Sequence, residues 1–406
     1  MPTTFAYKVR DHGGRVVEGQ LEAEDATLVA GKLRQMGYTP IQIQKKSSTK
    51  FSADLQIPGL GGRVKLKDVA VFSRQFATMI NSGLSLIRAL GILSEQTENA
   101  QLCKVVGEVR LDVERGSALS AALAKHPKVF NRLYIAMVRS GEAGGVLDAV
   151  LLRLSDTIEK QVELRRKVRS AMTYPIVVLS VCIVIATAML LFIVPQFKTI
   201  YADLGGTLPM PTQVLISISD LLKSYFPFVV ILAGIGVWLF RRWINTEDGR
   251  AKWDAFKLRV PVFGALVRKT ALARFSRTLA ALTRSGVGIL ESLEIVAETA
   301  GNEVVAVAVR DTQGAVKRGD TLSRPLAQHE VFPAMVVQMI AVGEETGALD
   351  EMLDKIADFY DQEVSATVDA LTSLIEPMLI VMMGTIVGGM IISLYLPMFN
   401  IIKLIK

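Results

Sequence analysis

"FSRQFATMINSGLSLIRAL", residues 72–90, returns later in the chain as "FSRTLAALTRSGVGILESL", residues 275–293. The match extends well beyond this stretch, because residues 72–126 and 275–329 agree at 19 of 55 positions without a gap. After one deleted residue it continues through "GE" at residues 141–142 and 343–344, and then to Pro175 and Pro377. Agreement on this scale indicates an internal duplication, so the chain contains two tandem copies of one structural unit.

Apolar residues within each unit recur every three or four positions, as at Phe72, Phe76 and Met79 in the first copy. This spacing is typical of short amphipathic helices, and glycines at equivalent places mark the turns between them. We predict one cytoplasmic six-helix bundle at residues 66–174 and a second at residues 241–376. The last helix of the first bundle, from Val146, is expected to continue into the following apolar stretch, with Pro175 bending it.

Three apolar stretches predict an all-α membrane protein. Half of the 406 residues are apolar, and the mean hydropathy of +0.37 exceeds the usual value for soluble proteins. We predict transmembrane helices at residues 175–195, 226–240 and 377–399. The second stretch reaches full length only by extending back over Leu221 and Leu222, with Lys223 reaching the interface. Residues 196–225 are predicted as an external loop and residues 400–406 as a short external tail.

Basic residues beside these stretches predict the orientation. Arginine and lysine favour the cytoplasmic ends of membrane helices, and the first span usually decides. Because the second span returns the chain, both bundles lie on the cytoplasmic side of the inner membrane. No signal peptide opens the sequence, so the N-terminus is also expected in the cytoplasm. The basic clusters therefore indicate a membrane surface and not nucleic acid. The predicted membrane-boundary residues are Arg165, Arg166, Lys167, Arg169, Pro175, Arg241, Arg242, Glu376 and Pro377.

The first 50 residues have a different pattern. "FAYKVR" and "VVEGQLEA" read as strands around a "DHGGR" turn, Ala26 to Met36 reads as a helix, and "TPIQIQ" reads as a third strand. We predict a small N-terminal α+β module at residues 1–50, followed by a linker at residues 51–65.

A glycine-rich turn occurs once in each repeat, as "SGEAGGVLD" and "GEETGALD". It lacks the Gly-Lys-Ser/Thr ending of a phosphate loop, and its carboxylates would repel a phosphate, so we predict an interhelical turn that faces a partner. Gly141 and Gly343 are expected in the left-handed conformation. Glu142 could cap the helix from Val146, pair with a neighbouring bundle, or present charge to a partner. The candidate residues are Gly141, Glu142, Gly145, Leu147, Asp148, Gly343, Glu344, Gly347, Leu349 and Asp350.

The histidines and cysteines show no pattern typical of a metal site, a disulfide or a catalytic site. His126 and His329 are equivalent in the two repeats but have no companions at ligand spacing, and Cys103 and Cys182 are not expected to pair. The sequence therefore predicts no metal, no cofactor and no catalytic site. "GTIVG", from Gly384 to Gly388, permits close helix packing, either between chains or inside one chain.

Together, the "FSR" motifs, the "GE" turns and the Tyr-Pro or Glu-Pro before each repeated span resemble inner-membrane platform proteins of type IV pilus and type II secretion systems, the PilC/GspF family. The resemblance covers nearly the whole chain. It implies a non-enzymatic protein that couples a cytoplasmic hexameric ATPase to pilin or pseudopilin insertion into, or removal from, a fibre. The implied partners are assembly and retraction ATPases, pilins, other inner-membrane assembly proteins and further copies of the chain. "LYLPMFNIIKLIK" looks more like the pilus branch.

An oligomeric transporter or channel subunit is the alternative function. Three spans form a poor conduit unless several chains assemble, and the first span lacks the ionisable residues expected along an ion pathway.

Overall fold

The structure is a computed structural model that describes residues 3–10, 16–23, 25–45, 64–203, 209–261 and 263–404. Its compact units are Met1–Arg63 and Val64–Lys406. The linker predicted at residues 51–65 lies outside the described residues except for Val64 and Lys65, and the "DHGGR" turn lies outside them entirely.

The N-terminal unit combines a three-stranded sheet with one helix. Its elements are β1 (Thr3–Arg10), β2 (Val16–Ala23), α1 (Ala26–Gln35) and β3 (Thr39–Lys45). The strands lie in the order β2-β1-β3, and both pairings are antiparallel. Val29 and Leu33, one helical turn apart on α1, are fully buried, as is Val9 of β1.

Six helices in the same order make up each repeat of the second unit. The first repeat contains α2 (Leu66–Asn81), α3 (Leu86–Gln96), α4 (Ala100–Glu114), α5 (Leu119–Ala124), α6 (Arg132–Gly144) and α7 (Leu147–Ala188). The second repeat contains α11 (Phe263–Arg284), α12 (Ile289–Thr299), α13 (Glu303–Lys317), α14 (Ser323–Leu326), α15 (Ala334–Thr346) and α16 (Leu349–Leu404).

An additional helix, α10 (Glu247–Arg259), gives the range 241–376 seven helices where six were predicted. Its start signals are present in the sequence. The Thr246 side chain accepts a hydrogen bond from the Gly249 N–H, and two acidic residues occupy the first turn. α10 lies before the matched residues 275–329, so the duplication did not predict it.

Buried apolar side chains from both repeats form one continuous core cluster. Within each repeat, the first helix packs along the last one, α2 on α7 and α11 on α16. Aromatic rings reinforce this arrangement. Phe72, Phe130 and Tyr134 contact one another as tilted rings in the first repeat, and Phe275 meets Phe332 edge-on in the second.

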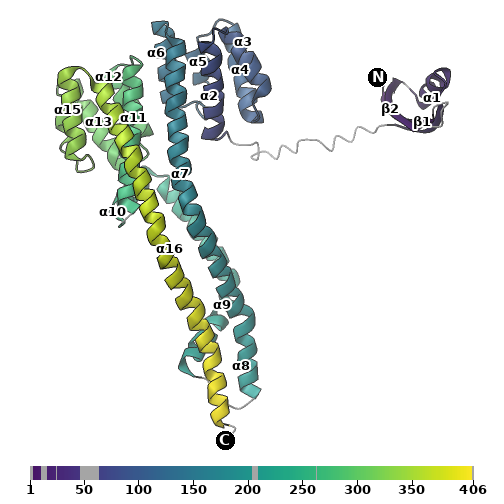
Figure 1. Cartoon of the computed structure of the whole chain (residues 1–406), viewed down its shortest axis with the longest axis vertical. Helices are drawn as coiled ribbons and strands as arrows, with labels where there is room; N and C mark the ends of the chain where they lie inside the picture. Colours follow the sequence, from purple (N-terminus) through teal and green to yellow (C-terminus); the bar gives the residue numbers. More distant parts are fainter. Residues whose placement is uncertain are drawn as a thin grey trace. The chain divides into compact units, whose positions relative to one another are not determined.

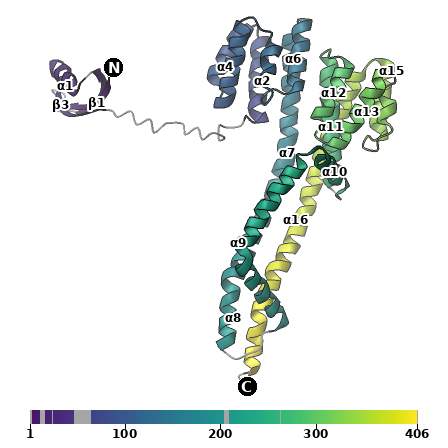
Figure 2. The same cartoon turned by 180° about the vertical axis from the view of Figure 1, so that it is seen from behind.

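Two long helices, α7 and α16, leave the bundles and run beside each other toward the C-terminal end (Figures 1 and 2). α7 passes through Pro175 without a break, as predicted. The helical stretches Leu147–Thr199 and Leu349–Leu396 are long and apolar enough to cross a membrane. Only 6% and 17% of their most apolar windows are buried, unlike the core helices of soluble proteins.

The range 196–225, predicted as a loop, is mainly helical. α8 (Val194–Asp203) follows α7 through a π-helical turn, η1 (Met189–Ile193), and α9 (Met210–Ile244) then returns toward α10. Val194, Ile216 and Leu394 are buried together where α8, α9 and α16 meet. The prediction failed because this apolar contact stabilises helices that a solvated loop would not form. The predicted second span lies within α9.

The π turn explains a hydrogen bond between α9 and the end of α7. The Val194 N–H donates to the Met189 carbonyl, and the next residue, Pro195, has no N–H. The Leu190 carbonyl is therefore left without its usual helical donor. Ser219 of α9, only 1% exposed, donates its hydroxyl to this carbonyl.

We expect Ser219→Ala to lower the free energy of unfolding of the detergent-solubilised chain by about 1 kcal/mol, because the Leu190 carbonyl loses its donor. Ser217→Ala is the matched control, since the Ser217 hydroxyl is exposed and bonds within its own helix. Equal thermal unfolding midpoints for the two variants would contradict this assignment.

Candidate functional site

The repeated glycine-rich turns join α6 to α7 and α15 to α16. Gly145 and Gly347 have φ of 66° and 73° and end the preceding helices. The sequence had assigned this conformation to Gly141 and Gly343, which instead lie inside helices. A Cβ on Gly343 would stand 2.9 Å from the Leu349 Cα atom, so glycine is needed there for close helix packing.

The repeated glutamates cap helices that lie elsewhere in each bundle. The Glu142 carboxylate accepts hydrogen bonds from the N–H groups of Leu119 and Ser120, at 2.5 and 3.0 Å. Glu344 does the same for Leu322 and Ser323, also at 2.5 and 3.0 Å.

These bonds neutralise the N-termini of α5 and α14 with charge-assisted contacts. Of the three roles considered for Glu142, capping of the helix from Val146 is therefore wrong, because the carboxylate caps α5 instead. Each glutamate thus joins the end of one helix to the start of the preceding helix, which explains why both repeats have a glutamate here.

The other turn residues divide between core and surface. Leu147 and Leu349 pack against the core, and Asp148 and Asp350 stand in the first turns of α7 and α16. Asp148 is exposed. Both turns lie at the ends of the bundles away from the apolar halves of the long helices (Figure 1).

The arginine of each "FSR" motif forms a fork with two carboxylates on the long helix. The Arg74 Nε atom donates to Glu159 at 2.7 Å, and its Nη2 atom also contacts Asp156. In the second repeat, Arg277 contacts Asp358 at 3.0 Å and also Asp361. The duplication thus preserves an ionic tie between the first and last helices of each bundle.

Burial and pairing shift the pKa values of the carboxylates in these forks in different directions. The hydrogen bond from Arg74 lowers the pKa of Glu159. Burial alone would raise the pKa of Asp358, but hydrogen bonds from Lys160 and Arg277 outweigh it and lower that pKa. Burial raises the pKa of Asp361 despite its contact with Arg277. Since the folded pKa of Glu159 lies below the unfolded value of about 4.3, its contribution to stability exists above that pH and is lost on acidification.

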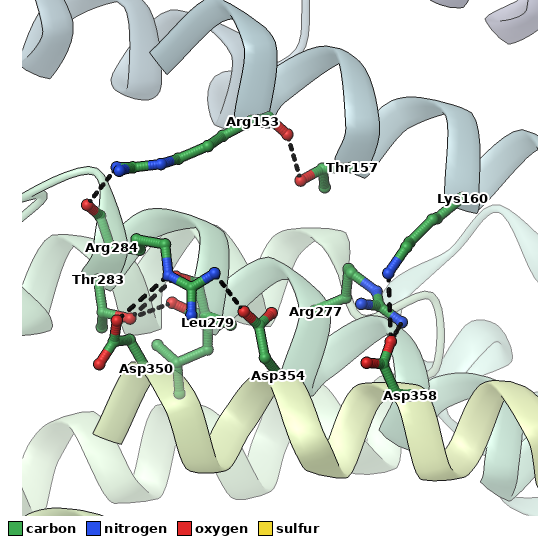
Figure 3. Close-up of polar contacts among 11 residues, drawn as sticks. Arg153, Thr157, Lys160, Arg277, Leu279, Thr283, Arg284, Asp350, Asp354 and Asp358 are labelled. Carbon is green, nitrogen blue, oxygen red and sulfur yellow. Dashed lines mark hydrogen bonds and ion pairs between the residues drawn. The ribbon is translucent and has the colours of Figure 1, made fainter. Parts of the chain in front are cut away.

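A polar seam joins the two repeats (Figure 3). Three aspartates spaced four residues apart share one face of α16 and meet basic residues of α11 and α7. The inter-repeat seam comprises Arg153 and Lys160 of α7, Arg277 and Arg284 of α11, and Asp350, Asp354 and Asp358 of α16.

Two contacts in the seam cross between repeats. The Arg153 Nη1 atom donates to the Arg284 carbonyl at 2.8 Å, and the Lys160 Nζ atom lies 3.2 Å from Asp358. Arg277 is only 8% exposed, whereas Lys160 and Asp358 are half exposed. Exposed pairs such as Lys160 and Asp358 stabilise by less than about 1 kcal/mol each. Their main effect is to fix the register of one repeat on the other.

Further ion pairs join α6 to α12. Arg132 lies 3.0 Å from Glu294 and also contacts Glu298, and Arg139 lies 3.5 Å from Glu291. These contacts could not be predicted from the sequence, because the partners are more than a hundred residues apart and meet only when the repeats pack.

The predicted membrane-boundary residues are distributed along the long helices. Pro175 is buried within α7, whereas Glu376 and Pro377 are exposed on α16. Arg241 and Arg242 occupy the last turn of α9, where the Arg242 guanidinium lies over the Trp238 ring at 5.7 Å. Arg166 and Lys167 are exposed, and Arg165 and Arg169 line a cavity.

Gly384 and Gly388 permit close helix packing either between two chains or inside one chain. A Cβ on either glycine would meet no described atom within 4 Å. The described part of the chain therefore gives no support to close packing inside one chain, which leaves the contact between chains as a proposal.

The repeated histidines pair with carboxylates. The Nε2 atom of His126 lies 3.7 Å from Glu108, and that of His329 lies 3.4 Å from Asp311. Within the described ranges, no group of three or more histidine, cysteine or acidic residues is arranged to hold a metal ion.

Comparison with known proteins adds independent findings. The family model described as type II secretion system protein F matches residues 72–195 and again residues 275–397, and the model for the N-terminal domain of that protein matches residues 1–44. The type IV pilus assembly protein PilC of Thermus thermophilus is 49% identical over 399 residues, 98% of each chain. PilC of Myxococcus xanthus is 45% identical over 398 residues, 98% of this chain and 94% of the relative. The type II secretion system protein F of Pseudomonas aeruginosa is 33% identical over 407 residues, 99% of each chain.

We expect Glu344→Gln to lower the free energy of unfolding by about 1–2 kcal/mol, since an amide loses the charge and one of the two acceptor oxygens at the start of α14. Glu142→Gln should behave alike in the first repeat. Glu345→Gln, at the exposed neighbouring position, should change stability by less than about 0.5 kcal/mol. Thermal unfolding of the solubilised chain measures all three, and a loss in Glu345→Gln as large as in Glu344→Gln would refute the capping role.

Proposed function

The chain belongs to the type II secretion system protein F family, and from that membership we propose that it is an inner-membrane platform for assembly of a type IV pilus. Relatives named as pilus assembly proteins share 49% and 45% of its residues, against 33% for a secretion protein, which supports the pilus branch. The proposed role is structural and not enzymatic. Its proposed partners are assembly and retraction ATPases, pilin or pseudopilin subunits and other inner-membrane assembly proteins.

Three membrane crossings fit this role, at residues 175–195, 226–240 and 377–399, with both bundles in the cytoplasm. α9 supports the second crossing. Its start bonds to the C-terminal part of α16, through the Thr212 hydroxyl and the Ser393 carbonyl, and its end packs on α10 beside the second bundle. Trp238 and Trp243 are exposed near that end, as expected at a membrane interface.

The observation that carries the proposal is the continuity of α7 and α16. Each is one helix with a bundle half and an apolar half. Because an unbroken helix is stiff along its axis, a displacement of the bundle moves the apolar half with it. The inter-repeat seam and the shared core couple both helices to the same displacement. We propose that an ATPase displaces the bundles and that the apolar halves pass the motion to fibre subunits.

Two surfaces are proposed as contacts in this machine. The glycine-rich turns, at the bundle ends away from the apolar halves, are proposed to face the ATPase (Figure 1). Their exposed Asp148 supports this proposal, whereas Glu142 is already engaged in capping. The open face around Gly384 and Gly388 is proposed to meet another copy of the chain.

The proposed orientation predicts which side chains a membrane-impermeant maleimide reaches in intact spheroplasts. In a chain carrying Cys103→Ser and Cys182→Ser, we expect Thr199→Cys to be labelled directly, because Thr199 is exposed on α8, beyond the first proposed span. Lys128→Cys, exposed in the first bundle, should be labelled only after permeabilisation. Labelling of Lys128→Cys in intact spheroplasts would contradict the orientation.

Helix continuity predicts that Ser170→Pro abolishes fibre assembly. The substitution removes a second helical hydrogen bond five residues before Pro175 and places the ring against the preceding turn, which kinks or breaks α7 at a cost of about 3 kcal/mol. Ser170→Ala, at the same exposed position, keeps the helix. In a deletion strain we expect surface fibres to fall more than tenfold with Ser170→Pro and less than twofold with Ser170→Ala, at equal amounts of membrane-inserted protein. Thr372→Pro and Thr372→Ala repeat the test in α16.

Normal fibre numbers with both proline variants would show that helix continuity is not used. Solute uptake by proteoliposomes containing the wild-type chain would favour a transporter instead.

A further inference from the structure

A cavity of about 870 Å³ lies between the two repeats, bounded by α7, α10, α11 and the turn between α12 and α13. Its lining is strongly basic. The basic side chains are Lys160, Arg165, Arg169, Lys257, Arg274 and Arg277, and Asp361 is the acidic one.

Half of these cations already have carboxylate partners. Lys160 pairs with Asp358, Arg277 with Asp358 and Asp361, and Lys257 with Asp254. Within the described part of the chain, Arg165, Arg169 and Arg274 form no ion pair or side-chain hydrogen bond. Burial, and then the nearby charge of Arg165, lower the pKa of Arg274. Two guanidinium groups that repel each other at a cavity wall are stabilised by an anion between them.

The Arg274 side chain packs against the backbone of Gly301, where only a glycine leaves room for it. A Cβ added to Gly301, which has φ of 76°, would stand 2.2 Å from the Arg274 Nη1 atom. The guanidinium therefore lies directly against the backbone of the turn before α13. Such contact restricts the side chain before any ligand arrives, which lowers the entropy lost on binding.

The duplication shows that these residues are particular to one repeat. At the equivalent positions, Arg274 corresponds to Val71 and Gly301 to Glu98. Likewise, Arg165 corresponds to Thr367 and Arg169 to Leu371. The capping glutamates and the arginine forks, which hold the bundle together, occur in both repeats. The three unpaired arginines of the cavity, by contrast, have no basic counterpart in the other repeat.

We propose that this cavity binds a phosphate group, held by the guanidinium groups of Arg274 and Arg165, with Arg169 as a third lining cation. Guanidinium pairs bind phosphate oxygens in a bidentate manner and remain charged at any physiological pH. The phosphate could be carried by a phospholipid headgroup or by a soluble compound.

The position of the cavity favours a lipid as the carrier, and this preference rests on the membrane placement proposed above. Arg169 lies seven residues before Ile176, about 10 Å along the helix, where the charge-free stretch of α7 begins. Met172, one turn nearer that stretch, also lines the cavity. Phe256, an exposed aromatic residue of α10, directly precedes the cavity residue Lys257.

The test measures binding to the full chain purified in a zwitterionic detergent, by isothermal titration with three probes. They are dihexanoyl phosphatidylglycerol, dihexanoyl phosphatidylcholine as the neutral lipid, and inorganic phosphate. We expect phosphatidylglycerol to bind, and Arg274→Gln and Arg165→Gln each to raise its Kd at least tenfold. Arg166→Gln removes the same charge from the same basic run outside the cavity, and should change the Kd less than twofold.

Inorganic phosphate that binds as tightly as phosphatidylglycerol, with the same response to the variants, would support the phosphate site with a soluble carrier. Absence of binding by both anionic probes would overturn the proposal, as would an equal loss in Arg166→Gln. Because Arg274 has no described partner to lose, Arg274→Gln should not lower the ligand-free unfolding midpoint. The exposed Arg165→Gln variant tests the site even if Arg274→Gln does not fold. None of these measurements depends on fibre assembly, so failure here would leave the platform role intact.

Discussion

A helix that starts in a water-facing bundle and ends in an apolar segment must change its surface while its backbone stays helical. In lipid no water can replace a lost hydrogen bond, so continuity is enforced physically. α7 and α16 both continue as one helix, although each contains a proline at the same repeat position, Pro175 or Pro377, that removes one backbone donor. The bundles form around these two helices, since the first helix of each repeat packs along the bundle half of its long helix.

Local sequence was sufficient to predict the duplication, the repeated helices and the unbroken course of α7, because helical periodicity and turn glycines act over a few residues. It failed wherever the partner lies far away in the chain. The position of Glu142 was clear, but its target, the start of α5, is more than twenty residues back and is reached only after the bundle closes. The turn glycines were misassigned for a related reason, since Gly141 is required by its packing against Val150 and not by its own φ. The inter-repeat seam requires both repeats to be packed before its ion pairs exist.

Comparison of the two repeats separates residues needed by the fold from residues needed by one copy. The arginine forks and the glutamate caps occur twice, with similar partners and distances. Lys160, by contrast, crosses from the first repeat to a fork of the second, where it shares Asp358 with Arg277. The carboxylate of Asp358 therefore contributes both to the fork of the second bundle and to the contact between the two bundles. Duplication followed by such local divergence converts two equal domains into one asymmetric body.

The π turn at Met189–Ile193 also sets the rotational phase of the helix that follows it. Successive residues of an α-helix are rotated by about 100°, so Val194 would point about 120° away from Cys182 in a regular helix. A π turn holds one extra residue, which brings Val194 to within about 20° of Cys182. Pro175, Cys182 and Val194 are all buried, and so they form one straight stripe. Deleting a residue inside the turn would preserve that stripe, whereas inserting one would swing Val194 away from Ile216 and Leu394.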